Sequence, residues 1–168
     1  MILSDQDIKR EIQNDRLMIY PLSEDTIREN GVDLRIGNKF GVFNNGGTID
    51  THSKGVSHVR VYEGNKFTIG ENEHVLIHTK EKIKMPDNVV GFINLRSTYA
   101  RYGLVLPPTV VDAGFEGELT IEVVGSSVPV IIYPNDRFVH LVFMYTNSPV
   151  KNTYGGKYQG QSGVTPSR

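Results

Sequence analysis

A glutamate stands within an apolar segment of this sequence, where its carboxyl group could act as a general acid or base. Glu122 belongs to the run 119–124, in which Leu, Ile and Val alternate with Thr120 and Glu122. Because side chains alternate faces along a strand, the apolar residues share one face, and Thr120 and Glu122 share the other. If that second face is covered, loss of water disfavours the charged carboxylate, which suits a group that must exchange protons. The alternative is an outward carboxylate on a half-exposed strand, the commoner situation for a charged residue.

A second candidate site is an arginine-bearing segment that follows an apolar strand. Residues 96–101 read Arg-Ser-Thr-Tyr-Ala-Arg. Ser97 is a residue type that caps helices, and the free N–H groups at such a helix start can bind an anion. Arg96 would stand just outside the helix and Arg101 more than one turn inside, so one arginine could bind phosphate while the other reaches a base or a carboxylate. The alternative is a surface helix with two solvated arginines, because the helix dipole disfavours cations near its start.

A third candidate is a stiff corner that carries an acid and an aromatic ring. The segment 107–118 begins with two prolines, which restrict the backbone, and Gly114 and Gly117 permit a tight turn around Phe115. Asp112, the ring of Phe115 and this rigid backbone could together clamp a sugar. The alternative is an ordinary proline–glycine corner between two strands.

The C-terminal part of the sequence combines flexibility with groups that bind phosphate or a base. Residues 154–163 contain Tyr154, Lys157 and Gln161 among several glycines. Such a segment could fold over a bound nucleotide as a flexible arm, formed by residues 150–168. A disordered terminus is the alternative, and the more usual interpretation.

The composition excludes several other functions. The 168 residues include 18 basic and 19 acidic side chains, with a formal net charge of −1. This balance argues against a nucleic-acid partner, which requires a basic face. The chain has no cysteine, which excludes disulfides, cysteine nucleophiles and thiolate zinc sites. No apolar run approaches the roughly 18 to 20 residues that span a bilayer, so we expect a soluble cytoplasmic protein without a membrane partner.

Short apolar segments separated by turn residues indicate a mainly β protein with one domain over 1–168. A short amphipathic helix is expected near the N-terminus, where Ser4 and Asp7 form a capping pair, and a second one near Ser97. Loops and edge strands are expected over 44–64. Strands are expected at 31–37, 75–79, 89–95, 119–124, 128–133 and 138–145. This pattern predicts a barrel or a jelly-roll-like pair of sheets.

Taken together in this order, these segments resemble the dCTP deaminase family, a branch of the dUTPase-like fold, and its archaeal members most. The resemblance runs nearly end to end. Its motifs are MILSDQDI at 1–8, DLRIG at 33–37, RSTYAR at 96–101, VDAGFEGELTIEV at 111–123 and KYQGQSGV at 157–164. It implies a distorted β-barrel, a homotrimer with active sites between subunits, and hydrolytic deamination of dCTP to dUTP and ammonia. It also implies Mg²⁺ bound with the triphosphate, and no zinc.

The resemblance further implies a role for each matching residue. Glu122 would be the acid–base catalyst, with Ser97 and Arg101 beside the reacting cytosine and the water. The other implied residues bind the substrate. The triphosphate would be bound by Arg96, Thr98, Lys157 and Gln161. Asp112 would bond to the 3′-hydroxyl, Phe115 would pack where a ribose 2′-hydroxyl must be excluded, and Tyr154 would cover the nucleotide. Thr120 and Ile121, next to Glu122, would also take part in substrate binding.

The sequence departs from the bacterial deaminases at one place, and other functions are alternatives. Between Arg101 and Asp112 the chain is shorter and carries Pro107-Pro108 in place of a Thr-Ala pair near the base, which could alter base preference. The main rival is a dUTPase in which Asp112 positions water for cleavage between the α- and β-phosphates. A bifunctional enzyme giving dUMP from dCTP, and a catalytically silent nucleotide-binding regulator, are further alternatives. Glu122, and a C-terminal segment without the arginine- and phenylalanine-containing glycine motif of dUTPases, favour the deaminase.

Overall fold

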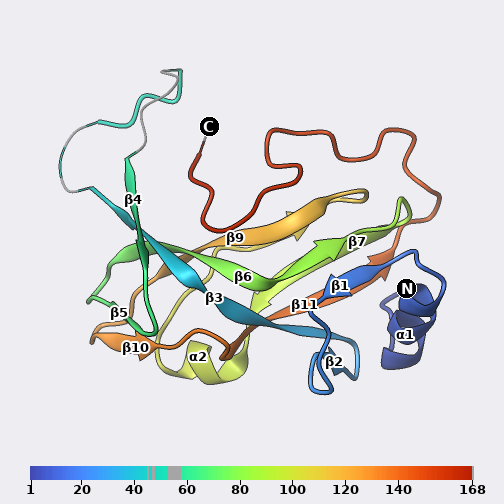
Figure 1. The fold of residues 1–168 in the computed structure, drawn as a ribbon, viewed down its shortest axis with the longest axis horizontal. Coiled ribbons are helices and arrows are strands. Elements are labelled where there is room, and N and C mark those ends of the chain that lie inside the picture. Colours follow the sequence, from blue (N-terminus) through green and yellow to red (C-terminus); the bar gives the residue numbers. More distant parts are fainter. Residues whose placement is uncertain (45, 47, 53–57, 168) are drawn as a thin grey trace.

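The computed structural model describes residues 1–44, 46, 48–52 and 58–167, and this part of the chain is mainly β. The helices are α1 (Asp5–Gln13) and α2 (Ser97–Arg101) (Figure 1). The strands are β1 (Met18–Tyr20), β2 (Ile27–Arg28), β3 (Gly31–Phe43), β4 (Val59–Glu63), β5 (Phe67–Ile69), β6 (His74–Lys84), β7 (Val89–Leu95), β8 (Thr109–Val111), β9 (Glu116–Val124), β10 (Val130–Ile132) and β11 (Arg137–Tyr145). Among these residues, no helix is long and apolar enough to cross a membrane.

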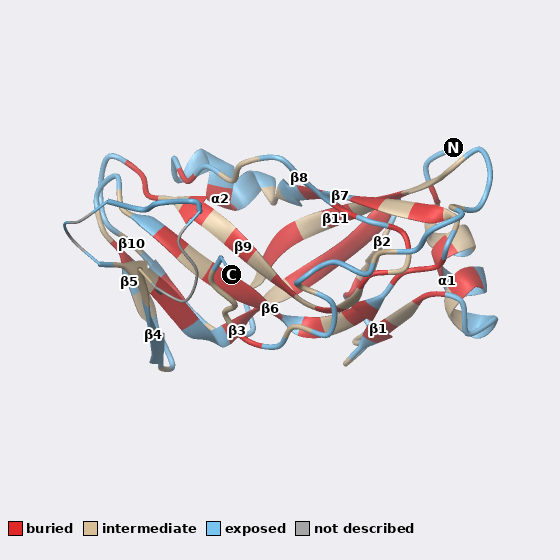
Figure 2. Cartoon of the chain, turned by 90° about the horizontal axis from the view of Figure 1, so that it is seen from above, coloured by how far each residue is buried: buried red, intermediate tan, exposed pale blue. Residues whose placement is uncertain are grey.

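The strands form one curled antiparallel sheet and a small second one. The order of the large sheet is β1-β6-β3-β11-β7-β8, with β2 and β4 also paired to β3 and β9 paired to β6. Strands β10 and β5 form the second sheet. The register shifts in the pairs β3–β6, β6–β9 and β3–β11, and such bulges bend and twist a sheet. The sheet therefore curls around its buried residues (Figure 2), which confirms the predicted mainly β, distorted barrel class.

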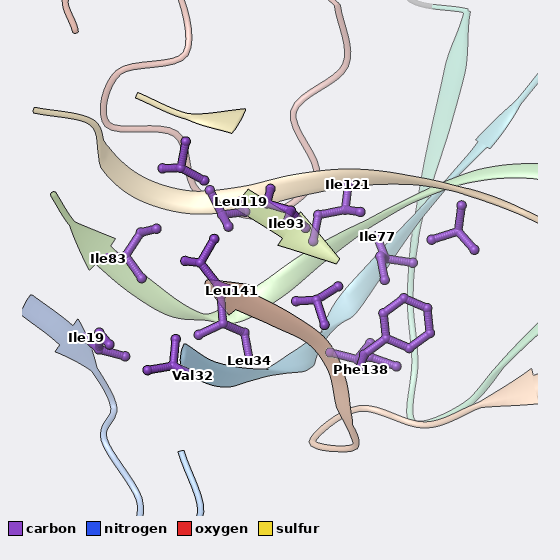
Figure 3. Close-up of a cluster of buried hydrophobic side chains, with 14 of the residues drawn as sticks. Ile19, Val32, Leu34, Ile77, Ile83, Ile93, Leu119, Ile121, Phe138 and Leu141 are labelled. Atoms are coloured by element: carbon purple, nitrogen blue, oxygen red, sulfur yellow. The ribbon is translucent and has the colours of Figure 1, made fainter. Parts of the chain in front are cut away.

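The core explains why β9 presents its acidic residues outward. Leu119 and Ile121 of β9 point into a cluster with Ile77 of β6, Ile93 of β7 and Leu141 of β11 (Figure 3). Burying each of these side chains stabilises the fold by roughly 1.5 to 3 kcal/mol. The period of two then places the alternate residues of β9 on the opposite face.

Helix α1 is attached by the predicted cap and by a buried acid that the sequence analysis did not identify. Ser4 and Asp7 form a capping box, as predicted. Glu11 has a side-chain exposure of only 2% and accepts hydrogen bonds from Arg16 Nη2 at 2.7 Å and from the Tyr145 hydroxyl at 2.7 Å. The bond from Arg16 lowers the pKa of Glu11, while burial and the contact with Glu11 raise the pKa of Tyr145 to about 12. The helix is thus tied to β11.

Several elements differ from the sequence predictions. Strand β3 continues to Phe43, six residues beyond the predicted end at Gly37, because it pairs with β4 and β6 as well as with β2 and β11. The strands β1, β2, β5 and β8 were not predicted, and each has only two or three residues. In the predicted loop 44–64, β4 confirms an edge strand, while 45, 47 and 53–57 lie outside the described residues.

Candidate active site

Glu122 lies on the outward face of β9 and is hydrogen-bonded to a histidine of β6. Leu119, Ile121 and Val123 are buried, whereas Glu122 is half-buried. Its Oε1 lies 2.9 Å from Nδ1 of His74, and the side-chain exposures are 41% for Glu122 and 56% for His74. The predicted alternation is confirmed. The described residues of this single chain leave the carboxylate partly exposed.

Ile121, predicted to take part in substrate binding, has its side chain in the core. It is 4% exposed, and its side chain points into the core beside Leu119 (Figure 3). The backbone N–H of Leu119 bonds to Thr79 of β6, so by alternation the backbone of Ile121 also faces β6. The side chain of Ile121 thus belongs to the core, and its predicted part in substrate binding stays a prediction.

Backbone hydrogen bonds hold both ends of the outer edge of β9. Among the described residues, no such bond is made by Thr120 or Glu122 on that edge, although the Thr120 hydroxyl bonds to Gly163 and Thr165 of the C-terminal segment. At one end, the N–H of Glu118 donates to the carbonyl oxygen of Gln161 at 3.0 Å. At the other end, the N–H of Val124 donates to the carbonyl oxygen of Val105 at 2.8 Å. The period of two directs the backbone groups of Thr120 and Glu122 to this same edge. A ligand placed there would meet backbone donors and acceptors next to the Glu122 carboxylate.

The C-terminal segment lies along β9 and has defined partners there, whereas the sequence favoured a mobile arm. Glu118 receives hydrogen bonds on its carboxylate from the N–H of Gly163 at 2.6 Å and from the hydroxyl of Ser162 at 3.2 Å. The side chain of Gln161 donates to the carbonyl oxygen of Glu118 at 2.8 Å. Thr120 donates its hydroxyl hydrogen to Gly163 O at 3.2 Å. Gln161, predicted to bind phosphate, thus binds β9 here.

The predicted sugar corner also contacts the C-terminal segment. The rings of Phe115 and Tyr154 meet edge to face with 5.6 Å between centroids. The N–H of Tyr154 donates to the carbonyl oxygen of Ala113 at 2.9 Å, and Asp112 is exposed. Gly114 has φ +82°, and a Cβ there would lie 2.5 Å from a carbon of Thr153, so this corner requires glycine. The structure thus brings Asp112, Phe115 and Tyr154 together.

The buried Asp33 holds Arg96 at the start of α2. Arg96 places its Nε 3.0 Å from Oδ2 of Asp33, whose side chain is 5% exposed, and donates from Nη1 to the carbonyl oxygen of Arg137 at 3.0 Å. Oδ1 of Asp33 lies 2.8 Å from Nδ1 of His140. Arg96 is the N-cap residue and makes no side-chain capping bond. The predicted cap at Ser97 is wrong, because Ser97 already has a helical backbone.

The predicted site residues fall into two groups within one chain. Ser97, Thr98 and Arg101 are exposed on α2 with Arg96 beside them, and Arg96 and Ser97 line a hollow shared with β3, β7 and β11. The second group comprises Asp112, Phe115, Thr120, Ile121, Glu122, Tyr154, Lys157 and Gln161, on β9 and the segments beside it. No hydrogen bond or ion pair among the described residues joins the groups.

The two histidines of β6 each pair with a different glutamate, which the sequence analysis did not find. His74 contacts Glu122, and His78 has its Nδ1 2.9 Å from Oε2 of Glu118. The two histidines are four apart in the sequence, so β6 places both on one face. Only the register of β6 against β9, in which Leu76 lies opposite Glu122, reveals the pairing. Over the described residues there is no group of three or more His, Cys, Asp or Glu that could hold a metal ion.

Known proteins share this fold. The crystal structure of 2′-deoxycytidine 5′-triphosphate deaminase from Agrobacterium tumefaciens superposes with a TM-score of 0.67 and 17% identity, over 84% of this chain and 47% of that chain. The chain therefore has the fold of a dCTP deaminase. A family model described as dCTP deaminase-like matches residues 2–146, and the protein belongs to this family.

Two relatives in sequence carry different names. A protein named dCTP deaminase from Desulfurococcus amylolyticus is 53% identical over 173 residues, covering 100% of this chain and 95% of that protein. A protein named probable deoxyuridine 5′-triphosphate nucleotidohydrolase from Sulfolobus islandicus rod-shaped virus 1 is also 53% identical, over 98% of this chain and 97% of that protein. The family is thus established, while identity alone does not separate the two activities.

Proposed function

We propose that the protein is a dCTP deaminase, which converts dCTP and water to dUTP and ammonia. The observation that carries this proposal is the position of Glu122, whose carboxylate lies on the outward face of β9 between the two hydrogen-bonded ends of its edge. A base that bonds to this edge would present its ring beside the carboxylate. A dUTPase, by contrast, needs its acid near the phosphates, not near the ring. The names of most of the similar relatives agree with deamination.

Glu122 performs the proton transfers of this reaction. It takes a proton from water as the oxygen attacks C4 of cytosine, and it delivers that proton to N3. It then moves the proton of the new C4 hydroxyl to the amino group, the C4–N bond breaks, and ammonia leaves with the bonding electrons. The carboxylate is regenerated and the ring is left as uracil. Positioned general acid–base groups typically accelerate such steps by about 10²- to 10⁴-fold.

A second copy of the chain supplies α2 to this site. Among the described residues of one chain, no hydrogen bond or ion pair joins α2 to Glu122. Strands β7 and β8 expose Phe92 and Val110, which are cross-strand partners. Exposed apolar surface of this kind favours association. We place Ser97 and Arg101 of one subunit beside the water and the cytosine, opposite Glu122 of its neighbour, in a homotrimer.

Complementation tests the shared site. Glu122→Gln and Arg101→Ala are each expected to be inactive, and the two proteins are mixed in equal amounts after reversible dissociation. If each site combines two chains, random reassembly restores about a quarter of the wild-type activity, because half of the sites have an intact α2 and half of those an intact Glu122. Absence of any recovery, with mixed trimers demonstrated by differential tagging, contradicts the arrangement.

The remaining residues bind the triphosphate and the sugar. Arg96 and Thr98 with Lys157 and Gln161 contact the phosphates, Asp112 the 3′-hydroxyl, and Phe115 and Tyr154 the nucleoside, with residues 150–168 as an arm over it. In this role Gln161 must release the carbonyl group of Glu118, which it binds here.

Mg²⁺ enters with the triphosphate, as is usual for this ion, and zinc plays no part. Activity that survives a zinc-specific chelator and requires added Mg²⁺ is expected.

A dUTPase is the second candidate, favoured by the name of the viral relative and by the exposed Asp112. The protein is incubated with Mg²⁺ and dCTP, and separately with dUTP, and ammonia and pyrophosphate are measured. Ammonia from dCTP without pyrophosphate supports the deaminase. Pyrophosphate from dUTP alone identifies a dUTPase, both products from dCTP identify a bifunctional enzyme, and binding without either product identifies a regulator.

A further inference from the structure

We propose that His74 is a positioning residue for Glu122, which holds one carboxylate oxygen and turns the other toward the reacting water. This inference rests on the proposed function. His74 begins β6 and lies opposite Val124, while Leu76 lies opposite Glu122. Cross-strand partners share a face, so His74 and Glu122 are diagonal neighbours on the outward face of the sheet. Two residues 48 apart in the sequence thereby become adjacent.

The contact occupies one specific atom of the carboxylate. Nδ1 of His74 lies 2.9 Å from Oε1 of Glu122, an ordinary hydrogen-bond distance. Among the described residues, no other hydrogen bond to the Glu122 side chain is present. Oε2 therefore stays available for the water and, in the trimer, for the groups of a neighbouring α2. With Nδ1–H as the donor, the imidazole fixes the plane of the carboxylate.

A second histidine–glutamate pair on the same two strands lies in a different environment. His78 and Glu118 have side-chain exposures of 7% and 22%. The Glu118 carboxylate also accepts a hydrogen bond from the N–H of Gly163 in the C-terminal segment. That pair is part of the packing. His74 and Glu122 are 56% and 41% exposed, and exposed ion pairs contribute little to stability. The His74 contact is thus weak as a structural bond and close to the proposed chemistry.

Positioning matters because Glu122 must reach both the water and N3. A long side chain on an exposed face samples several rotamers, and a misplacement of about 1 Å can lower a rate by about 10²-fold. His74 removes part of this freedom before the substrate arrives. The expected signature is a loss in kcat with little change in KM, since His74 contacts the carboxylate and not the substrate.

The test compares three substitutions of His74. The amide nitrogen of asparagine can replace Nδ1, whereas that of glutamine reaches further, toward the place of Nε2. We expect His74→Ala and His74→Gln to lower kcat for ammonia release from dCTP by about 10- to 100-fold with KM within about twofold, and His74→Asn to recover to within about fivefold of wild type. His52→Ala is the matched control, because His52 is exposed and its described bond is through its backbone N–H; its kcat should equal that of wild type.

Thermal unfolding separates positioning from a structural role. The His74 variants should unfold within about 4 °C of wild type, since an exposed pair contributes little. If His74→Ala keeps the wild-type kcat, or if the Asn and Gln variants are equally impaired, the positioning role is wrong. If wild-type protein releases no ammonia from dCTP, the proposed function itself fails and the inference fails with it.

Discussion

Replacing Asp33 with asparagine tests whether the buried aspartate holds Arg96 and the start of α2 in place. The carboxylate faces Nε of Arg96 at 3.0 Å and Nδ1 of His140 at 2.8 Å, and Arg137 Nη1 at 3.5 Å. Asparagine has the same shape, but it removes the negative charge. Its amide NH₂ also replaces one carboxylate oxygen, so that a donor faces Arg96 or His140 where an acceptor stood. The cationic groups then lose their buried counter-charge.

The magnitude follows from the burial of these groups. Breaking a fully buried ion pair from one side costs about 3 to 5 kcal/mol. Here Asp33 is 5% exposed while Arg96 and His140 are 29% and 24% exposed, so water partly compensates and we expect a loss of about 2 to 3 kcal/mol. For a chain of this size, that is a decrease in Tm of about 4 to 12 °C. KM for dCTP should also rise, because Arg96 loses its fixed orientation.

Differential scanning calorimetry and steady-state kinetics measure both effects. Asp25→Asn is the matched control, since Asp25 also pairs with Arg137, at 3.2 Å, but its side chain is 53% exposed. It should change the stability by less than about 1 kcal/mol. An Asp33→Asn protein that melts with the control and keeps the wild-type KM would refute the reasoning.

Three further predictions follow from the site and its supports. Glu122→Gln should bind dCTP as wild type does but lose ammonia release by at least about 10²-fold; normal turnover would overturn its role. The bond from Arg16 lowers the pKa of Glu11, so its stabilising contribution is present above the unfolded-state pKa and disappears as pH falls through the lower folded-state value. Urea titrations should therefore show wild type more stable than Glu11→Gln near pH 7, with the difference shrinking in acid; a constant difference contradicts this. Gly114→Ala should lower the unfolding free energy by about 2 kcal/mol or more, because φ is +82° and the Cβ would clash with a side chain at 2.5 Å. Unchanged chemical denaturation of that variant would show that the corner adapts.

Local patterns in the sequence determined those parts of the molecule that depend on near neighbours along the chain. The capping box of Ser4 and Asp7 formed as predicted, because a helix cap involves residues three apart. The outward direction of Glu122 was determined by the period of two in β9. The strand β7 has the bounds predicted for it, Val89–Leu95, because turn residues flank an uninterrupted apolar run.

Tertiary structure decided everything that depends on which strands lie side by side. The contacts of His74 with Glu122 and of Asp33 with Arg96 require a register or a topology that no local pattern encodes. The C-terminal segment has no apolar period, yet it lies on β9 because the edge of that strand offers unpaired backbone groups and the Glu118 carboxylate. Side-chain direction is a local property of the backbone, whereas pairing across a sheet is a property of the whole chain.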